Sequence, residues 1–303
     1  MERKVENNKS KILVLLSFLL MIVIATFIIK DIDTPEDSPN KLNSSNVILV
    51  RLKDQATLMQ KNSRERIYPA SLTKMMTAIV AIEKLPDLEV VIKLGDSIFE
   101  DLSGANASMT GFEPEEEVRA IDLLYGALLP SGAESCIGLA CQIAGSEDEF
   151  VEMMNQKAKE LGMDNTHFVN TTGLHDDNHY TSVEDMAELL SYALQNNTFR
   201  KIFTASRYST KPTNMHPDGI TYHSTMFQKL NEQDIVGGEI LGGKTGYTDV
   251  AGLCLASLAK VNNQEYILIT TGAKGNLRSK QYNIADAIKV YNNIGTLHVL
   301  DNN

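Results

Sequence analysis

Residues 69–77 read Pro69-Ala70-Ser71-Leu72-Thr73-Lys74-Met75-Met76-Thr77, and they place a serine and a lysine three residues apart where a helix is predicted to begin. The apolar residues from Met75 to Leu85 are mostly spaced three or four apart, which indicates that helix. Positions i and i+3 share one helical face, so the amine of Lys74 can reach the hydroxyl of Ser71. A desolvated lysine loses its proton more easily and can then activate a serine as a nucleophile. The alternative is that Ser71 only caps the helix.

The pattern Ser-x-x-Lys is weak evidence alone, because about one match is expected by chance in a chain of 303 residues. Two further matches, Ser38 with Lys41 and Ser257 with Lys260, lie in a proline-containing linker and on a predicted strand. Residues three apart on a strand point to opposite faces. Only the first match lies at a helix start.

Two more motifs follow along the chain. Ser131-Gly132-Ala133 comes after an apolar helical stretch, where a serine and a glycine are also an ordinary helix end. Lys244-Thr245-Gly246 lies in a predicted strand and could present a cation and a hydroxyl to a carboxylate. Its glycine would let a ligand approach the backbone closely, although a glycine-rich turn is the alternative. In this order the three motifs are far more specific together than any one alone.

With these motifs the chain resembles, over about residues 46–294, the low-molecular-mass penicillin-binding proteins that act as serine D-Ala-D-Ala carboxypeptidases. The stretch from Phe168 to Tyr180 is similar to the Asn-x-x-Gly-Leu-His loop of that family. The resemblance implies an α/β fold of the β-lactamase/transpeptidase type, with a mostly antiparallel sheet flanked by helices plus a helical subdomain. It implies removal of the terminal D-alanine from peptidoglycan stem peptides, covalent inhibition by β-lactams, and no metal or organic cofactor.

The resemblance also implies which residues carry the chemistry. Ser71 would attack the carbonyl between the two terminal D-alanines and become acylated. Lys74 would accept its proton, and Ser131 would help relay a proton to the leaving D-alanine.

Substrate binding is implied for the third motif. Lys244 and Thr245 would hold the terminal carboxylate, and the backbone N–H groups of Ser71 and Tyr247 would form an oxyanion hole. One departure concerns the second motif, where the family usually has asparagine and this chain has Ala133. That change predicts lower activity unless another group substitutes for the amide.

Three alternatives remain open from the sequence. Ala133 suggests a β-lactam-binding sensor, and a transpeptidase would share the same acyl-enzyme. A β-lactamase is disfavoured because residues 160–165 do not match the glutamate segment that commonly serves deacylation. A zinc hydrolase would need three protein ligands. His175 and His179 are four residues apart, and no third ligand is clear, although His167 is possible.

The N-terminal segment predicts a membrane anchor. Residues 12–29 are an 18-residue run broken only by Ser17 and Thr26, with basic residues before it and acidic residues after it. A cleaved signal peptide is the alternative. We expect a cytoplasmic tip and transmembrane signal-anchor (1–30), a linker (31–45) and a carboxypeptidase domain (46–303). The predicted location is the bacterial cell membrane, single-pass, with the catalytic domain on the extracellular face.

Composition and patterning complete the prediction. The hydrophobic fraction of 43% is that of a globular protein, and the net charge of −11 makes nucleic acid an improbable partner. The three cysteines, at 136, 141 and 254, are interpreted as small buried hydrophobes. Strands are expected in 47–59, 252–260 and 265–272, and helices in 119–129, 134–144 and 281–294 and after the capping boxes at Ser146 and Thr181.

Overall fold

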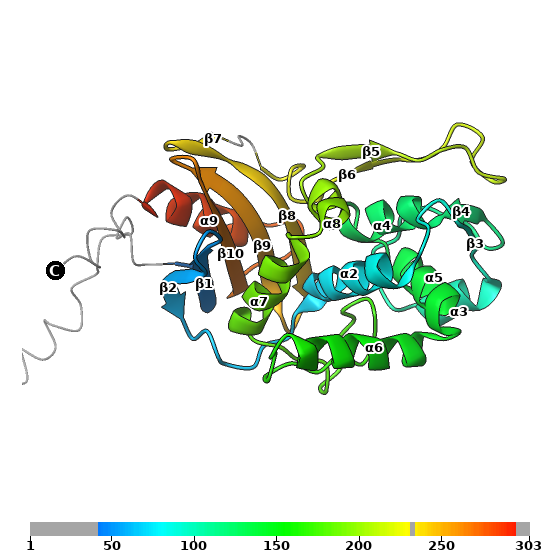
Figure 1. Ribbon diagram of the computed structural model, residues 1–303, viewed down its shortest axis with the longest axis horizontal. Helices are drawn as coiled ribbons and strands as arrows, with labels where there is room; N and C mark the ends of the chain where they lie inside the picture. Colours follow the sequence, from blue (N-terminus) through cyan, green and yellow to red (C-terminus); the bar gives the residue numbers. More distant parts are fainter. Residues whose placement is uncertain (1–41, 231–233, 295–303) are drawn as a thin grey trace, which may run out of the picture. The chain divides into compact units, whose positions relative to one another are not determined.

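The computed structural model describes residues 42–230 and 234–294, and a six-stranded sheet lies at the centre of this part (Figure 1). The strand order is β2-β1-β10-β9-β8-β7, and every neighbouring pair is antiparallel. Strands from the two ends of the chain pair as predicted, with Asn46 opposite Thr271. The strands are β1 (Asn46–Arg51), β2 (Ala56–Lys61), β7 (Asp234–Ile235), β8 (Gly238–Thr248), β9 (Gly252–Val261) and β10 (Gln264–Ala273).

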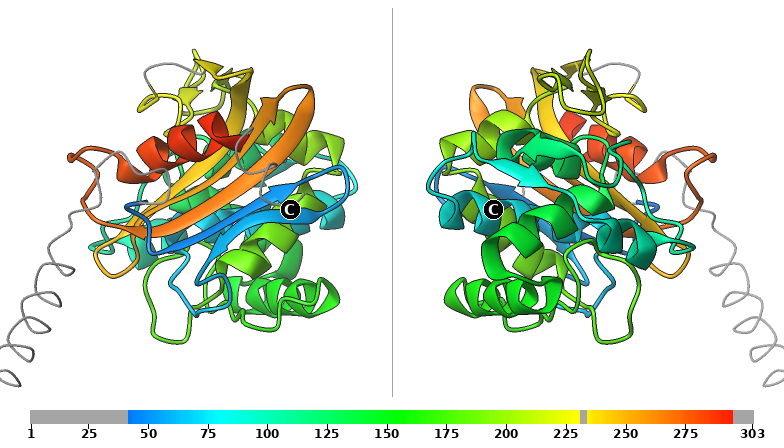
Figure 2. Two further views of the ribbon diagram at one scale, coloured as in Figure 1. Left: turned by 90° about the vertical axis from the view of Figure 1, so that its left-hand side faces the viewer. Right: turned by 90° about the vertical axis from the view of Figure 1, so that its right-hand side faces the viewer.

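The sheet is buried on both faces, because alternate side chains of β1 enter two different apolar clusters. Val47 and Leu49 pack with Tyr291 of helix α9 (Tyr282–Asn292). Ile48 and Val50 pack into the larger cluster on the opposite face. Figure 2 shows α9 lying across β9 and β10 on one side of the sheet, with the other helices on the opposite side. This arrangement confirms the predicted antiparallel sheet flanked by helices.

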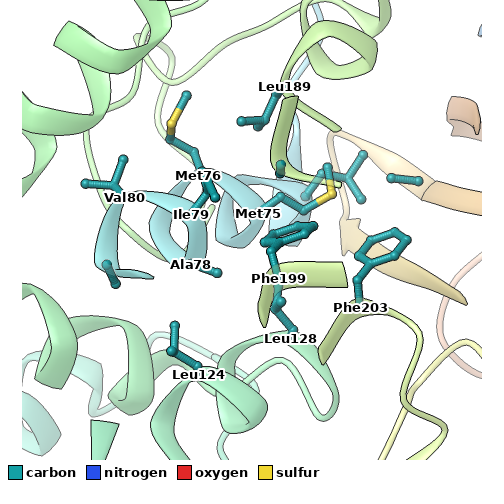
Figure 3. Packing of buried hydrophobic residues seen from close by; sticks show 14 of the residues in the cluster. Met75, Met76, Ala78, Ile79, Val80, Leu124, Leu128, Leu189, Phe199 and Phe203 are labelled. Atoms are coloured by element: carbon teal, nitrogen blue, oxygen red, sulfur yellow. The ribbon is translucent and has the colours of Figure 1, made fainter. Parts of the chain in front are cut away.

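Helix α2 (Lys74–Lys84) is enclosed on all sides, and every residue from Lys74 to Ala81 is buried. Figure 3 shows Met75 beside Phe199, one of several apolar residues from the surrounding helices. Burying a side chain of this size contributes about 1.5–3 kcal/mol, so the first turn of α2 is firmly held. The enclosing helices are α4 (Ala120–Leu128), α5 (Ala133–Ala144), α6 (Glu147–Glu160), α7 (Val183–Ala193) and α8 (Asn197–Phe203).

The two predicted capping boxes have different outcomes. At the start of α6, the Ser146 hydroxyl accepts a hydrogen bond from the Glu149 N–H at 3.2 Å, as expected. At the start of α7 the prediction is wrong by one residue, since Ser182 is the cap and accepts from the Asp185 N–H at 3.1 Å.

Several short elements have no counterpart in the prediction. They are α3 (Asp96–Leu102), the pair β3 (Val91–Lys93) with β4 (Glu117–Arg119), and the pair β5 (Arg207–Ser209) with β6 (Thr221–His223). Three-residue strands and a two-turn helix carry too few periodic positions to stand out in a sequence.

The predicted single-pass location in the bacterial cell membrane, with an extracellular catalytic domain, needs correction. Among the described residues no helix is both long and apolar enough to cross a bilayer. The longest helix there, α6, has 14 residues and therefore extends about 21 Å, whereas the hydrocarbon core is about 30 Å thick. The membrane contact predicted for residues 12–29 lies outside the described residues.

Candidate active site

The predicted nucleophile and its lysine lie together at the start of the enclosed helix. Ser71 is in a short 3-10 turn (Ala70–Thr73), so it precedes α2 and does not act as a side-chain cap. Lys74 Nζ donates to Ser71 Oγ at 3.2 Å and to the carbonyl oxygen of Thr172 at 2.5 Å. The 3.2 Å between Lys74 Nζ and Ser71 Oγ is short enough for direct proton transfer between serine and lysine.

Lys74 is almost completely buried, with 3% of its surface exposed. Burial lowers the pKa of Lys74 because the ammonium form loses its hydration. The carboxylates of Glu134 and Glu147 act in the opposite direction and raise that pKa. Because the pKa is lowered, a larger fraction of Lys74 is the neutral amine at a given pH, and this is the form that can accept a proton.

A hydrogen bond joins the second motif, at Ser131, to the third motif, at Lys244. Lys244 Nζ donates to Ser131 Oγ at 2.8 Å and to the carbonyl oxygen of Thr245 at 2.8 Å. Ser131 has a φ of +74°, a conformation rarely adopted by residues other than glycine, which marks it as a strained position. Lys244 is fully buried, and burial together with the nearby charge of Lys74 holds its pKa well below the usual value.

The strand β8 passes close to the turn that carries Ser71. A Cβ atom added at Gly246 would lie 3.2 Å from the Pro69 carbonyl oxygen and 3.2 Å from the Ser71 nitrogen. A side chain at Gly246 would therefore be crowded, because the backbones of β8 and the turn come close together. Next to this contact, the Thr245 and Thr225 hydroxyls form a hydrogen bond of 2.6 Å.

A cleft of about 460 Å³ opens above these groups. Ser71, Lys74 and Tyr247 line it, whereas Ser131 and Lys244 lie behind this lining and are joined to each other. The residues that line the cleft are Ser71, Lys74, 105–108, Ala133, 172–175, 247–250 and Leu277. The predicted site residues are thus brought to one region, but Lys244 is more deeply placed than the sequence suggests.

The Asn170–Gly173 turn forms one wall of the cleft. Asn170 Oδ1 accepts hydrogen bonds from the N–H groups of Thr172 and Gly173, at 3.1 and 2.7 Å. Gly173 has a φ of +79°, and a Cβ atom there would lie only 1.8 Å from the Ala70 carbonyl oxygen. The turn therefore lies directly against the residue that precedes Ser71.

His179 is hydrogen-bonded to the turn that carries Ser71. The Val169 N–H donates to its Nδ1 at 3.2 Å, so Nε2 carries the proton and donates to Thr73 Oγ1 at 2.8 Å. The Thr73 hydroxyl in turn donates to the Ala70 carbonyl oxygen at 2.9 Å. Burial lowers the pKa of His179 to about 4, so the imidazole is neutral at physiological pH.

The described residues do not provide a set of zinc ligands around the three candidate histidines. His167 Nδ1 pairs with the Asn178 carbonyl oxygen at 2.8 Å, His175 packs edge-on against Tyr68, and His179 is buried. Across 42–230 and 234–294, no three His, Cys, Asp or Glu side chains are grouped so that they could hold a metal ion.

A loop that the sequence did not single out is tied to the second motif. The Ala133 N–H donates to the Ser108 carbonyl oxygen at 2.8 Å. The buried carboxylate of Glu134 accepts from the N–H groups of Thr110 and Gly111, at 2.6 and 3.2 Å. Residues 103–108 are small or polar and include one glycine, and in a sequence such a stretch indicates only a connecting loop.

The comparisons with known proteins agree with this geometry. A model of the D-alanyl-D-alanine carboxypeptidase family matches residues 33–275. The D-alanyl-D-alanine carboxypeptidase DacF of Bacillus subtilis is 34% identical over 235 residues, which are 76% of this chain and 57% of that protein. The DacA enzyme of Haemophilus influenzae is 29% identical over 78% of this chain and 58% of its own length. The chain thus spans a little under three fifths of these curated relatives.

Two solved structures share the fold. A mutant of a Streptomyces DD-transpeptidase superposes with a TM-score of 0.75 at 25% identity, covering 83% of this chain and 97% of that one. Penicillin binding protein 5 from Haemophilus influenzae gives a TM-score of 0.71 at 26% identity, covering 84% of this chain and 71% of that one. The predicted transpeptidase-like fold is confirmed by these similarities.

Proposed function

From the premise that this chain belongs to the D-alanyl-D-alanine carboxypeptidase family, we propose that it removes the terminal D-alanine from peptidoglycan stem peptides through an acyl-enzyme on Ser71. The observation that carries the proposal is the 3.2 Å contact between Ser71 Oγ and the buried amine of Lys74. A neutral amine in that position is a general base aimed at the nucleophile.

In the first step, Ser71 Oγ attacks the carbonyl carbon of the peptide bond and Lys74 Nζ takes the hydroxyl proton. The resulting oxyanion lies between the backbone N–H groups of Ser71 and Tyr247, where each donor is worth about 3–4 kcal/mol. Collapse of the intermediate breaks the C–N bond, and the leaving D-alanine nitrogen takes a proton that Ser131 relays. Water then attacks the ester carbonyl, which releases the shortened peptide and restores the Ser71 hydroxyl.

The substrate carboxylate is proposed to lie at the end of β8. The Thr245 hydroxyl, which now pairs with Thr225, would turn to that carboxylate. Lys244 would contribute its charge from behind the lining of the cleft, through its contact with Ser131. A β-lactam carries a carboxylate and an amide in a similar relation, so it would acylate Ser71 and act as a covalent inhibitor.

We also propose that residues 46–303 form the carboxypeptidase domain and residues 31–45 a linker. The last residues of that linker already belong to the compact unit that begins at Leu42, and they contact α9. The backbone N–H groups of Asn43 and Ser44 donate to the two oxygens of the Asp286 carboxylate on α9, at 3.1 and 2.7 Å.

The test is labelling of the full chain with a fluorescent penicillin, with D-alanine release from diacetyl-Lys-D-Ala-D-Ala measured in the same samples. We expect both signals in the natural chain and neither in Ser71→Ala. A chain that takes the label but releases no D-alanine would refute the carboxypeptidase proposal and favour a sensor.

Transpeptidation is the second candidate, because the similar Streptomyces structure is named a DD-transpeptidase. It shares the acyl-enzyme and differs in the acceptor, so added glycylglycine distinguishes the two. Release of free D-alanine with formation of a ligated peptide would indicate transpeptidation, whereas an unligated, shortened peptide would indicate hydrolysis.

A further inference from the structure

A carboxylate on α6 is connected to the general base through an unbroken series of contacts. Glu147 Oε1 accepts from the Thr171 N–H at 2.8 Å and from the Thr171 hydroxyl at 2.6 Å. The Thr171 carbonyl oxygen accepts from the Thr77 hydroxyl of α2 at 2.7 Å. The carbonyl oxygen of the next residue, Thr172, receives the hydrogen bond from Lys74 Nζ. The two ends of this series therefore lie on α6 and at the first residue of α2.

We propose that Glu147 is a positioning residue for the reaction, which holds the Thr172 carbonyl against Lys74 through its hydrogen bonds to Thr171. The proposal rests on the proposed function, since it assigns a role within the same acylation step. It adds a residue that none of the three motifs contains.

The position of Glu147 at a helix start has an ordinary explanation that must be separated from this role. Glu147, Asp148 and Glu149 all lie in the first turn of α6, where acidic residues favour the helix dipole. Asp148 and Glu149 are exposed, whereas Glu147 is half-buried and turned to the Asn170–Gly173 wall of the cleft. The dipole therefore accounts for the charge at all three positions but not for the hydrogen bonds that Glu147 makes to Thr171.

The hydrogen bonds from Thr171 fix more than one side chain. Thr171 and Thr172 are both buried, so their backbone groups cannot turn to water if the carboxylate is lost. If the Thr172 carbonyl moved away, Lys74 Nζ would lose that hydrogen bond and keep the one to Ser71 Oγ. Free rotation of the amine would then lower the fraction of time that it faces the serine in the reactive geometry.

The charge of Glu147 acts on Lys74 together with those of its other neighbours. The groups that face or influence this amine are Ser71 in the 3-10 turn, Glu134 and Cys136 on α5, Glu147 on α6, Lys244 on β8 and His179. Glu134 and Glu147 are the carboxylates among them, and both raise the pKa of Lys74 against the lowering effect of burial. Removing the charge at Glu147 therefore favours the neutral amine at a lower pH.

The experiment compares acylation of the full chain by a fluorescent penicillin, as a second-order rate constant from pH 5 to pH 10, in Glu147→Gln and Asp148→Asn. Both variants lose one negative charge from the first turn of α6, and only one of them contacts Thr171. We expect the acid limb of the profile, where the rate falls because Lys74 is protonated, to move to lower pH in Glu147→Gln and to stay in place in Asp148→Asn. The glutamine oxygen still accepts from Thr171, so this variant isolates the charge.

Two further variants separate the charge from the geometry. Glu147→Ala removes both, and we expect a plateau about tenfold lower in addition to the shifted limb. Thr171→Val keeps the charge and removes one hydrogen bond, so we expect a lower plateau with the limb unmoved. An acid limb in Glu147→Gln that coincides with that of Asp148→Asn, together with a full plateau in Glu147→Ala, would overturn the proposal. Failure of the proposed function looks different, because the natural chain would then show no Ser71-dependent labelling.

Discussion

Replacing Gly173 with alanine tests whether the Asn170–Gly173 turn sets the geometry of the nucleophile. The added Cβ would lie 1.8 Å from the Ala70 carbonyl oxygen and 2.4 Å from its carbon, both of which are backbone atoms. Neither can rotate away, so the turn and the backbone before Ser71 must move apart. Relief of the overlap to an ordinary contact requires a displacement of roughly 1.5 Å, since carbon atoms in contact lie about 3.5 Å from their neighbours.

The size of the effect follows from two separate terms. Alanine at a φ of +79° costs about 1–2 kcal/mol, because its Cβ crowds the carbonyl oxygen in the left-handed region. In a domain of this size, 1 kcal/mol shifts the Tm by about 2–4 °C, so this term alone predicts a loss of about 2–8 °C. The displacement adds a catalytic term, since misplacing a reacting group by about 1 Å can reduce the rate by roughly 100-fold.

Gly162→Ala provides the matched control. Gly162 has a similar φ of +72°, but nothing lies within 4 Å of the position of its Cβ, so this variant carries the backbone term alone. Thermal unfolding and the rate of acylation by a fluorescent penicillin are measured for both variants. We expect similar losses in Tm for the backbone term, a further loss in Gly173→Ala, and an acylation rate at least tenfold lower in Gly173→Ala only. Equal acylation rates in the two variants would refute the reasoning.

Three further outcomes are expected. In a double-mutant cycle of Ser131→Ala and Lys244→Met, the effects on acylation are coupled by about 0.5–1.5 kcal/mol, because the two side chains share a hydrogen bond; additive effects would contradict this. His179 has a folded pKa of about 4, below its ordinary 6.5, so urea titrations should show up to about 3 kcal/mol of stability present above pH 6.5 and lost toward pH 4, with a smaller loss in His179→Gln. Burial raises the pKa of Cys136 and Cys254 to about 12, so neither thiol should react with a thiol reagent at pH 8 until the protein unfolds.

The parts of the fold that the sequence predicts are those with a long, regular pattern. β9 is mostly apolar and β10 contains the apolar run Tyr266–Ile269, with a two-residue turn between the two strands. Such runs are typical of strands buried on both faces. The start of α2 is predicted because the apolar residues from Met75 to Leu85 are mostly spaced three or four apart, and the structure buries every residue from Lys74 to Ala81. The error at α7 arises because Thr181 and Ser182 are adjacent and both residue types cap helices well.

The site was predictable only where its chemistry is concentrated in short motifs. Glu147 precedes Thr171 by 24 residues, and in the sequence it is one of three acidic residues at a helix start. Its function depends on α6 lying beside the Asn170–Gly173 turn, which is a tertiary contact without a local signal. Lys244 was recognised as a cation, but its burial behind Ser131 follows from the packing of β8 against the turn Ala70–Thr73 and from its contact with Ser131, which no spacing reveals.

The two buried lysines explain why so many polar groups converge on one region. Burial lowers the pKa of both, and the charge of Lys74 lowers that of Lys244 further. Glu134 and Glu147 act in the opposite direction on Lys74, so in the free protein they favour the positive charge at the lysine that must be neutral to react. A substrate carboxylate beside Thr245 would favour the charge at Lys244 instead, and a charged Lys244 would in turn favour a neutral Lys74. Under the proposed function, carboxylate binding and activation of Ser71 are therefore linked through one shared charge. Glu134 and Glu147, which raise the pKa of Lys74, oppose that shift in the free protein.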